Sequence, residues 1–217
     1  YEGSRAYAGE PVSMHCAKAL NSMLEPGDIV YIMTGFILRP HRQPETDGIV
    51  GAILLARALV EAYDVKPVIV CPEENVVAIK NCSPLIGMHL YEDIPTLLEM
   101  PQSFGVYPFT KKMEEVEENI HRLFSYGLPK VLISTEAPGA NEKGEYHNAV
   151  GINMTELEAK MDGLFDAVKN LGIKTFAVGD LGNEIGMGAI GEHIRKYIPY
   201  AAEGECQCGC GGGLLAR

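Results

Sequence analysis

Short, wholly apolar segments alternate with amphipathic segments along most of this chain, and this alternation limits the fold more than any other feature. Residues 29–33, 66–71, 88–91, 130–134 and 174–178 are predicted strands, and residues 12–24, 48–63, 73–79, 111–126, 155–171 and 184–197 are predicted helices. A continuous apolar run is typical of a strand that is buried on both faces, as in a parallel sheet. The sequence therefore predicts an α/β fold with a doubly wound, mostly parallel sheet and helices on both faces, a Rossmann-like three-layer arrangement.

Length and composition predict one globular domain. A chain of 217 residues, 47 % of them hydrophobic, has enough apolar material for a single core, so we assign residues 1–217 to one α/β domain. Because the first residue is Tyr rather than Met, the sequence fits a piece of a longer chain. It contains neither a membrane-length apolar stretch nor a signal-peptide pattern, and we expect a soluble protein of the cytoplasm or, in a eukaryote, of the mitochondrial matrix.

The charge balance narrows the class of partner. Acidic residues outnumber basic residues by 29 to 18, which gives a net charge of −11. Such a charge repels both a nucleic-acid backbone and an anionic membrane surface. We therefore expect a small-molecule partner, with no nucleic acid and no membrane. A homo-oligomer, or contact with an additional domain of a longer chain, stays open.

The six cysteines fall into two groups. Cys16, Cys71 and Cys82 lie in apolar or mixed segments and are typical of reduced thiols, whereas Cys206, Cys208 and Cys210 form a C-x-C-x-C run followed by three glycines. The run lacks the paired C-x-x-C spacing of a structural zinc site. We interpret it as a glycine-rich strand whose alternate cysteines share one face, or as a frayed end, in preference to metal or redox chemistry.

In a doubly wound sheet the ligand lies beyond the carboxyl ends of the strands, so the loops that follow strands carry the function. The loop after residues 29–33 holds carboxylates and cationic groups and then enters a helix. A role in capping that helix and a role in function explain Asp47 equally well. Glu45 has no capping role and is the stronger functional candidate. The candidates in this loop are Thr34, Gly35, Arg39, Arg42, Glu45, Asp47 and Gly48.

The loop after residues 130–134 is long and rich in Pro and Gly, as the wall of a binding site often is. Glu136 comes two residues after the predicted strand, where its side chain would point into the crevice. Glu142 and Glu145 resemble exposed loop charges, and His147 is a weaker candidate. The candidates in this loop are Ser134, Thr135, Glu136 and Asn141.

The loop after residues 174–178 contains Asp180, Asn183 and Glu184. Helix capping is an equally good explanation for Asn183 and Glu184. Three glycines further on match G-x-G-x-x-G, but a dinucleotide fingerprint begins directly at the end of its strand and this one does not. We interpret these glycines as a close-packed helix start. All three loops are expected to converge on one crevice.

Together these loops resemble the D-glutamate cyclase family, in particular the domain that forms the C-terminal part of its longer members. The motifs that carry the resemblance are Glu45-Thr46-Asp47-Gly48 with Gly51-Ala52, Ser134-Thr135-Glu136 with Pro138-Gly139 and Asn141, and Gly179-Asp180 with Gly182-Asn183-Glu184-Ile185-Gly186-Met187-Gly188. The resemblance implies a carbon–oxygen lyase, a hydro-lyase that converts D-glutamate into 5-oxo-D-proline and water.

That reaction requires a base for the amine and a group that makes a carboxylate electrophilic. We expect Glu136 or Asp180 to be the catalytic base. A divalent cation, Mg²⁺ or Ca²⁺, is the expected cofactor if one is used, with Glu45, Asp47, Asp180 and Glu184 as its ligands. Otherwise Glu45 and Asp47 would anchor the ammonium group of the substrate. Arg39 or Arg42 would hold the carboxylates of the substrate. The expected substrate-binding residues are Thr34, Gly35, Arg39, Arg42, Glu45, Asp47, Gly48, Ser134, Thr135, Asn141, Asn183 and Glu184.

Two other functions fit the same sequence. One is a non-catalytic α/β module that binds a small amino acid or a nucleotide. The other is a Mg²⁺-dependent enzyme that acts on a phosphorylated metabolite, although Lys and Arg are scarce in the two later loops. Turnover of substrate separates the cyclase from the binding module.

Overall fold

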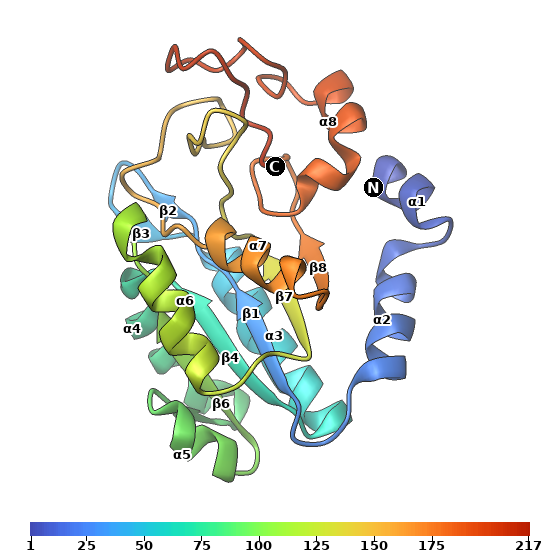
Figure 1. Cartoon of the computed structure of the whole chain (residues 1–217), viewed down its shortest axis with the longest axis vertical. Helices are drawn as coiled ribbons and strands as arrows, with labels where there is room; N and C mark the ends of the chain where they lie inside the picture. The colour runs from blue at the N-terminus through green and yellow to red at the C-terminus, as the bar shows by residue number, and fades with distance from the viewer.

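The computed structural model describes residues 1–217 and shows a six-stranded, fully parallel sheet (Figure 1). The strand order is β5-β6-β4-β1-β7-β8. The strands are β1 (Ile29–Met33), β4 (Lys66–Cys71), β5 (His89–Tyr91), β6 (Ser103–Pro108), β7 (Val131–Thr135) and β8 (Lys174–Val178). The predicted doubly wound α/β fold is confirmed.

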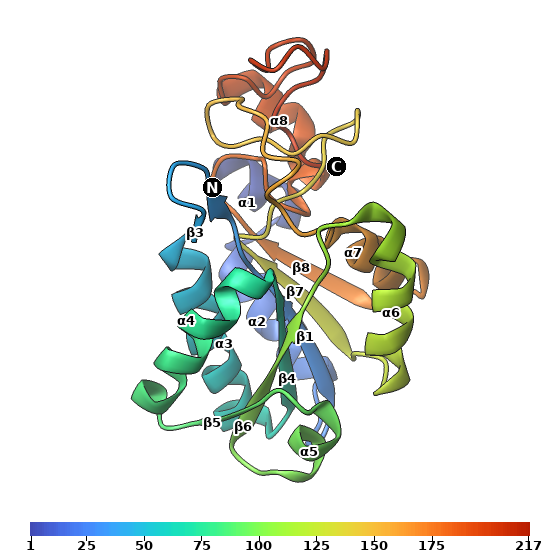
Figure 2. The same cartoon turned by 90° about the vertical axis from the view of Figure 1, so that its left-hand side faces the viewer.

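Helices cover both faces of the sheet. Figure 2 shows α3 and α4 on one side of the sheet and α6 and α7 on the other. The helices are α1 (Glu2–Ala8), α2 (Val12–Met23), α3 (Thr46–Tyr63), α4 (Glu73–Cys82), α5 (Ile94–Glu99), α6 (Val116–Ser125), α7 (Asp162–Asn170) and α8 (Gly191–Tyr197). Short 3-10 turns are η1 (Ser83–Ile86), η2 (Met113–Glu115) and η3 (Met187–Ile190). No helix in the structure is both long enough and apolar enough to cross a membrane.

The central strand β1 explains the three layers. Val30 and Ile32 pack into the core cluster beneath α3 and α4, whereas Tyr31 and Met33 pack into the cluster beneath α5, α6 and α7. Successive side chains of a strand point to opposite faces, so a strand between two helical layers is apolar at every position. This is why residues 29–33 form an unbroken apolar run.

Most predicted elements are present, and several further elements are not evident in the sequence pattern. β1, β4 and β8 have the predicted bounds, but α1, α5 and the inner strand β6 were not predicted. The predicted loop after residues 29–33 contains a small antiparallel hairpin, β2 (Ile37–Leu38) with β3 (Gln43–Pro44). The predicted helices 111–126 and 184–197 begin as the 3-10 turns η2 and η3.

The prediction of a helix over 155–171 was wrong for its first half, because α7 begins only at Asp162. Tertiary hydrogen bonds hold the preceding residues in an irregular conformation. The buried carboxylate of Glu158 accepts a hydrogen bond from the backbone N–H of Ile37, at 3.1 Å. The buried Lys160 ammonium donates to the carbonyls of Thr155 and Glu158. A segment whose polar groups are satisfied by distant partners need not follow its helical periodicity.

The glycines of the G-x-G-x-x-G run allow close packing, as expected. A Cβ at Gly186 would lie 2.4 Å from the Cβ of Ala177. A Cβ at Gly188 would lie 2.9 Å from the carbonyl carbon of Arg217, so the last residues of the chain lie directly against η3. The run therefore serves close packing against β8 at Gly186 and against the C-terminal segment at Gly188.

The topology leaves a crevice at one end of the sheet. β1 pairs with β4 on one side and with β7 on the other. The strands of this sheet that come next in the sequence are therefore added on one side of β1, and the later strands β7 and β8 are added on its other side. Such a reversal point opens a crevice at the carboxyl ends of the strands. The β2–β3 hairpin, the long segment after β7 and the C-terminal segment gather at this end of the sheet (Figure 1).

Candidate active site

A cleft of about 290 Å³ lies between the three loops that follow β1, β7 and β8. This volume is at the low end for small-molecule sites and suits a small metabolite. The sequence candidates that line it are Arg39, Glu45, Asp47, Glu136, Asp180, Asn183 and Glu184. The expected convergence of the three loops is therefore present, whereas the roles assigned to these residues stay predictions.

Glu136 occupies the centre of the acidic group. Its backbone has a φ of 50°, a left-handed conformation that is unusual for a residue with a side chain and that often marks a functional site. Two hydrogen bonds fix this conformation: its N–H donates to the carbonyl of Val178, and its carbonyl accepts from the N–H of Gly35. Glu136 is thereby held between the ends of β8 and β1.

The surroundings of Glu136 raise the pKa of its carboxyl group to about 8. Burial is the main cause, and the negative charges of Glu184, Asp180, Asp47 and Glu45 add to it in that order. Both effects disfavour the ionised form. A carboxyl group that titrates near neutral pH can both accept and donate a proton, which is typical of a general acid–base residue.

Glu184 has a structural task. Its buried carboxylate accepts hydrogen bonds from the backbone N–H groups of Asp180, Leu181 and Gly182, at 3.1, 3.2 and 2.7 Å. Burial raises its pKa, and the bonds from Asp180 and Leu181 act in the opposite direction. The helix-capping explanation was wrong for Glu184, because the helical residues begin only at Met187 and no side chain caps η3 or α8. The Glu184 carboxylate instead holds the loop in the shape that presents Asp180.

Asp180 is exposed, and one carboxylate oxygen from each of Glu136, Asp180 and Glu184 lies within 4.8 Å of the others. Glu45 and Asp47 are outside this compact group. The predicted cation ligands Glu45, Asp47, Asp180 and Glu184 therefore all line the cleft. The closest group of carboxylates is a different set, because it contains Glu136 in place of Glu45 and Asp47.

The first loop adds a second acidic pair. Glu45 is the N-cap residue of α3, but its side chain makes no capping bond, and burial together with Asp47, Asp180 and Glu184 raises its pKa. Asp47 accepts a hydrogen bond from the N–H of Gly48 at 2.7 Å. Arg39 is the one basic side chain in the lining.

Asn183 belongs to the cleft wall and has one buried side-chain acceptor without a partner. Its amide nitrogen donates to the backbone carbonyl of His147 at 3.0 Å, and its buried Oδ1 has no hydrogen-bond partner. A buried polar atom without a partner is costly, so such an atom in a cleft wall is suited to a ligand. A substrate ammonium or amide would satisfy it.

The remaining predicted residues lie outside the lining of this cleft. Arg42 lines a neighbouring cleft that it shares with Arg39. Asn141 uses its side chain within the loop, where it donates to Gly213 and accepts from Lys143 and Glu145. Thr34, Gly35, Gly48, Ser134 and Thr135 lie beneath the lining or at the ends of β1 and β7.

Comparison with known proteins places the chain in a family. The family model described as "D-glutamate cyclase-like, C-terminal" matches residues 3–216. The chain belongs to the D-glutamate cyclase-like family. It is also similar to the human (Homo sapiens) protein named "D-glutamate cyclase, mitochondrial", with 30 % identity over 179 residues that cover 79 % of this chain. The match spans 27 % of the length of that relative.

Two groups of residues in this D-glutamate cyclase-like domain were missed by the sequence reasoning. Apolar residues such as Phe36, Ala149 and Val150 line the cleft, and nothing in their residue type announces this. The second group is His147 with Cys206, Cys208 and Cys210, whose ligand atoms lie within 4.8 Å of one another. The C-x-C-x-C run was the available signal, and the preferred interpretation of a strand or a frayed end was wrong because these residues form turns that face His147.

Proposed function

We propose that this domain catalyses a D-glutamate cyclase reaction, in which D-glutamate closes to 5-oxo-D-proline and releases water. Membership of the family supports the proposal. The observation that carries it is Glu136, a half-buried carboxyl group in a left-handed conformation whose pKa is raised to about 8. The reaction needs such a group, because protons must leave the amine and reach the departing oxygen.

In the proposed mechanism the substrate amine attacks the side-chain carboxyl carbon. A C–N bond forms, one C–O bond breaks, and the two protons that the ammonium group loses leave with the oxygen as water. Glu136 accepts a proton from the ammonium group and passes it to the leaving oxygen. Its near-neutral pKa suits both steps.

Charges around the cleft supply the means to hold the substrate. Arg39 would bind one of its carboxylates. The unpartnered Oδ1 of Asn183 and the exposed carboxylate of Asp180 would accept hydrogen bonds from the ammonium group. Asp180 then either orients the amine or acts as the base in place of Glu136. Separate substitution of Asp180 and of Glu136 shows which of the two is the base.

A hard divalent cation, Mg²⁺ or Ca²⁺, is a further part of the proposal. Oxygen ligands from the acidic lining would hold it, and it would offset repulsion between these carboxylates and an anionic substrate. Calorimetry on chelator-treated protein tests this directly. Saturable binding below millimolar concentration supports a built-in site, and the absence of any binding heat refutes it.

The test of the activity is turnover of D-glutamate, followed by chiral chromatography of 5-oxoproline. It is run on the protein with its natural flanking sequence and on residues 1–217. Glu136→Gln is expected to lower kcat by about 10²- to 10⁴-fold. Glu142→Gln, in the same loop but exposed, is the matched control and should behave as the wild type.

Two outcomes would contradict this function. If the protein with its natural flanking sequence makes no 5-oxoproline, the cyclase proposal fails. If it makes 5-oxoproline and both Glu136→Gln and Asp180→Asn match the wild type in kcat/KM, the activity stands but its site has been placed wrongly.

A further inference from the structure

Four side chains that can bind a metal meet near the end of the chain, and they come from two segments that are far apart in the sequence. His147 comes from the long segment after β7, and Cys206, Cys208 and Cys210 come from the C-terminal segment after α8. One ligand atom of each lies within 4.8 Å of all the others. None of these residues belongs to the lining of the acidic cleft.

The distances between these atoms approach those of a tetrahedral zinc site. Zn–S bonds of about 2.3 Å and Zn–N bonds of about 2.0 Å give S···S separations of about 3.8 Å and N···S separations of about 3.5 Å. The Sγ of Cys206 lies 3.4 Å from that of Cys208 and 3.3 Å from that of Cys210. The Nε2 of His147 lies 3.2 Å from the Sγ of Cys208 and 3.8 Å from that of Cys210. Small outward shifts of the thiols would admit the ion.

The backbone between the cysteines is shaped to turn them toward one point. Gly209 and Gly211 have φ angles of 78° and 81°, a left-handed conformation that glycine adopts without strain. They flank Cys210 and let the chain reverse its direction on both sides of it. Alternate cysteines in an extended strand would instead lie in a row, too far apart to share an ion.

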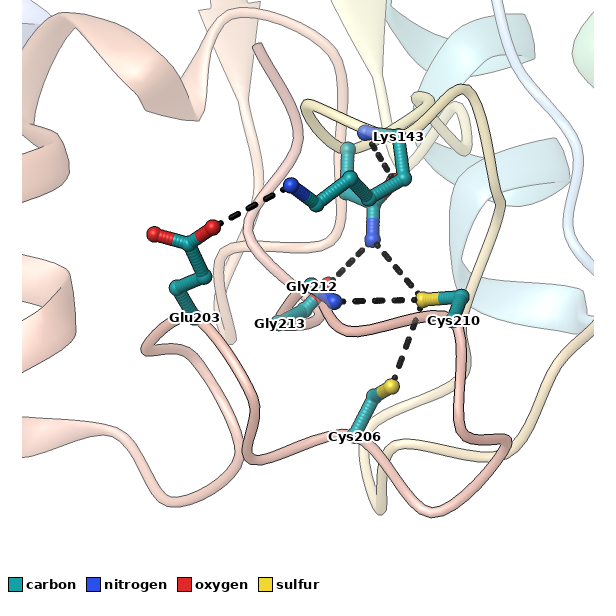
Figure 3. A network of polar contacts seen from close by, with 7 residues as sticks. Lys143, Glu203, Cys206, Cys210, Gly212 and Gly213 are labelled. Atoms are coloured by element: carbon teal, nitrogen blue, oxygen red, sulfur yellow. Dashed lines mark hydrogen bonds and ion pairs between the residues drawn. The ribbon is translucent and has the colours of Figure 1, made fainter.

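Hydrogen bonds around Cys210 resemble the outer shell of a metal site. Figure 3 shows Cys206 and Cys210 facing each other, with the N–H of Gly212 donating to the sulfur of Cys210. The side-chain amide of Asn141 donates to the same sulfur at 3.7 Å. Donors of this kind orient a thiolate ligand and stabilise its charge.

We propose that His147, Cys206, Cys208 and Cys210 bind one zinc ion, which ties the C-terminal segment to the segment that forms a wall of the acidic cleft. Three thiolates and an imidazole are the soft and borderline donors that select zinc, in a closed structural site. Three cysteines also cannot all pair with one another as disulfides, because one thiol is left over.

The position of the ion gives it a structural role. After α8 ends at Tyr197, the last twenty residues contain no helix or strand, and an ion at the cysteines fixes their path. Asn148, Ala149 and Val150 follow His147 directly and line the cleft, and the carbonyl of His147 receives the hydrogen bond of Asn183. Zinc would therefore steady this wall without taking part in any reaction there.

The test is cobalt substitution of the reduced protein, followed by competition with zinc. Chelator-treated protein titrated with Co²⁺ should bind one ion per chain and show thiolate-to-cobalt charge-transfer absorption together with the visible bands of tetrahedral Co²⁺. Zinc should abolish both and raise the Tm. Cys208→Ser should weaken these bands and the zinc-induced shift in Tm, whereas Cys82→Ser on α4 should leave them unchanged. Cys208 is exposed, so its substitution should not prevent folding.

Thiol counting makes the result decisive. If Cys206, Cys208 and Cys210 all react with Ellman's reagent and the folded protein binds no Co²⁺, the zinc site does not exist; Cys71 is buried and is not expected to react. A disulfide that joins two of the three C-terminal cysteines in protein kept under reducing conditions would overturn it equally. Both readouts are independent of cyclase activity, so failure here leaves the proposed function untouched.

Discussion

Glu136→Gln is expected to stabilise the protein at high pH while it removes activity. The pKa of Glu136 is about 8 in the folded state and 4.5 is its ordinary value. The folded state therefore holds the proton more tightly than the unfolded state, so this group lowers the free energy of unfolding progressively as the pH rises from about 4.5 to about 8. A glutamine of nearly the same size carries no charge and avoids that loss.

The size of the effect follows from the shift in pKa. The difference between these two pKa values corresponds to roughly 5 kcal/mol for a group fully shielded from solvent, since each pKa unit is worth about 1.4 kcal/mol. Glu136 is only about half-buried, and solvent screening reduces the expected gain to about 1–2 kcal/mol. In a domain of this length that gain raises the Tm by about 2–8 °C.

Urea denaturation of the wild type and of Glu136→Gln at pH 5 and pH 9 measures the effect. The stabilisation should be small at pH 5 and close to its full value at pH 9. Glu142→Gln, an exposed neighbour in the same loop, should show no such dependence on pH. A variant that is destabilised at pH 9, or equally stabilised at both pH values, would refute the assignment of a buried, charge-crowded carboxyl group at position 136.

Three further predictions follow from the cleft. If Glu136 is the base, kcat/KM for D-glutamate should rise with pH toward a plateau above about 8, and a profile that is flat from pH 6 to pH 9 would contradict it. Gly48→Ala should lower both activity and the free energy of unfolding, because its Cβ would lie 2.7 Å from the Oγ1 of the buried Thr34 and 2.9 Å from the Cβ of Glu136, while Gly51→Ala, whose nearest neighbour is 3.6 Å away, should leave activity intact. Glu184→Ala should lower the free energy of unfolding by about 1–3 kcal/mol in urea titrations, because it strands three backbone N–H groups, and a loss confined to activity would show that the carboxylate has no structural role.

The sheet could be predicted from the sequence because its strands lie between two helical layers. β1 and β4 are apolar at nearly every position, and this signal depends on burial alone. β6 carries the sequence Ser-Phe-Gly-Val-Tyr-Pro, in which glycine and proline hide the strand. A Cβ at Gly105 would lie 2.7 Å from Leu97, so this glycine reflects the close packing of α5, which a single sequence does not reveal.

The acidic side of the cleft could likewise be predicted, because each carboxylate follows a strand closely. Glu136 comes directly after β7 and Asp180 is the second residue after β8, and parallel strands bring their carboxyl ends to one edge. The far wall could not be predicted, since Asn148 and Val150 reach the cleft through a long irregular segment. The contact of His147 with the C-terminal cysteines could not be predicted for the same reason, because it joins two segments that lack regular secondary structure.

A crystal structure with 5-oxo-D-proline or D-glutamate bound is the most direct test that this cleft is the active site. We predict that the ligand lies between Glu136, Asp180 and Asn183, with a carboxylate on Arg39 and its nitrogen within hydrogen-bond distance of Glu136 or Asp180. A ligand that is well ordered in any other part of the domain, with the acidic cleft empty, would contradict the central claim.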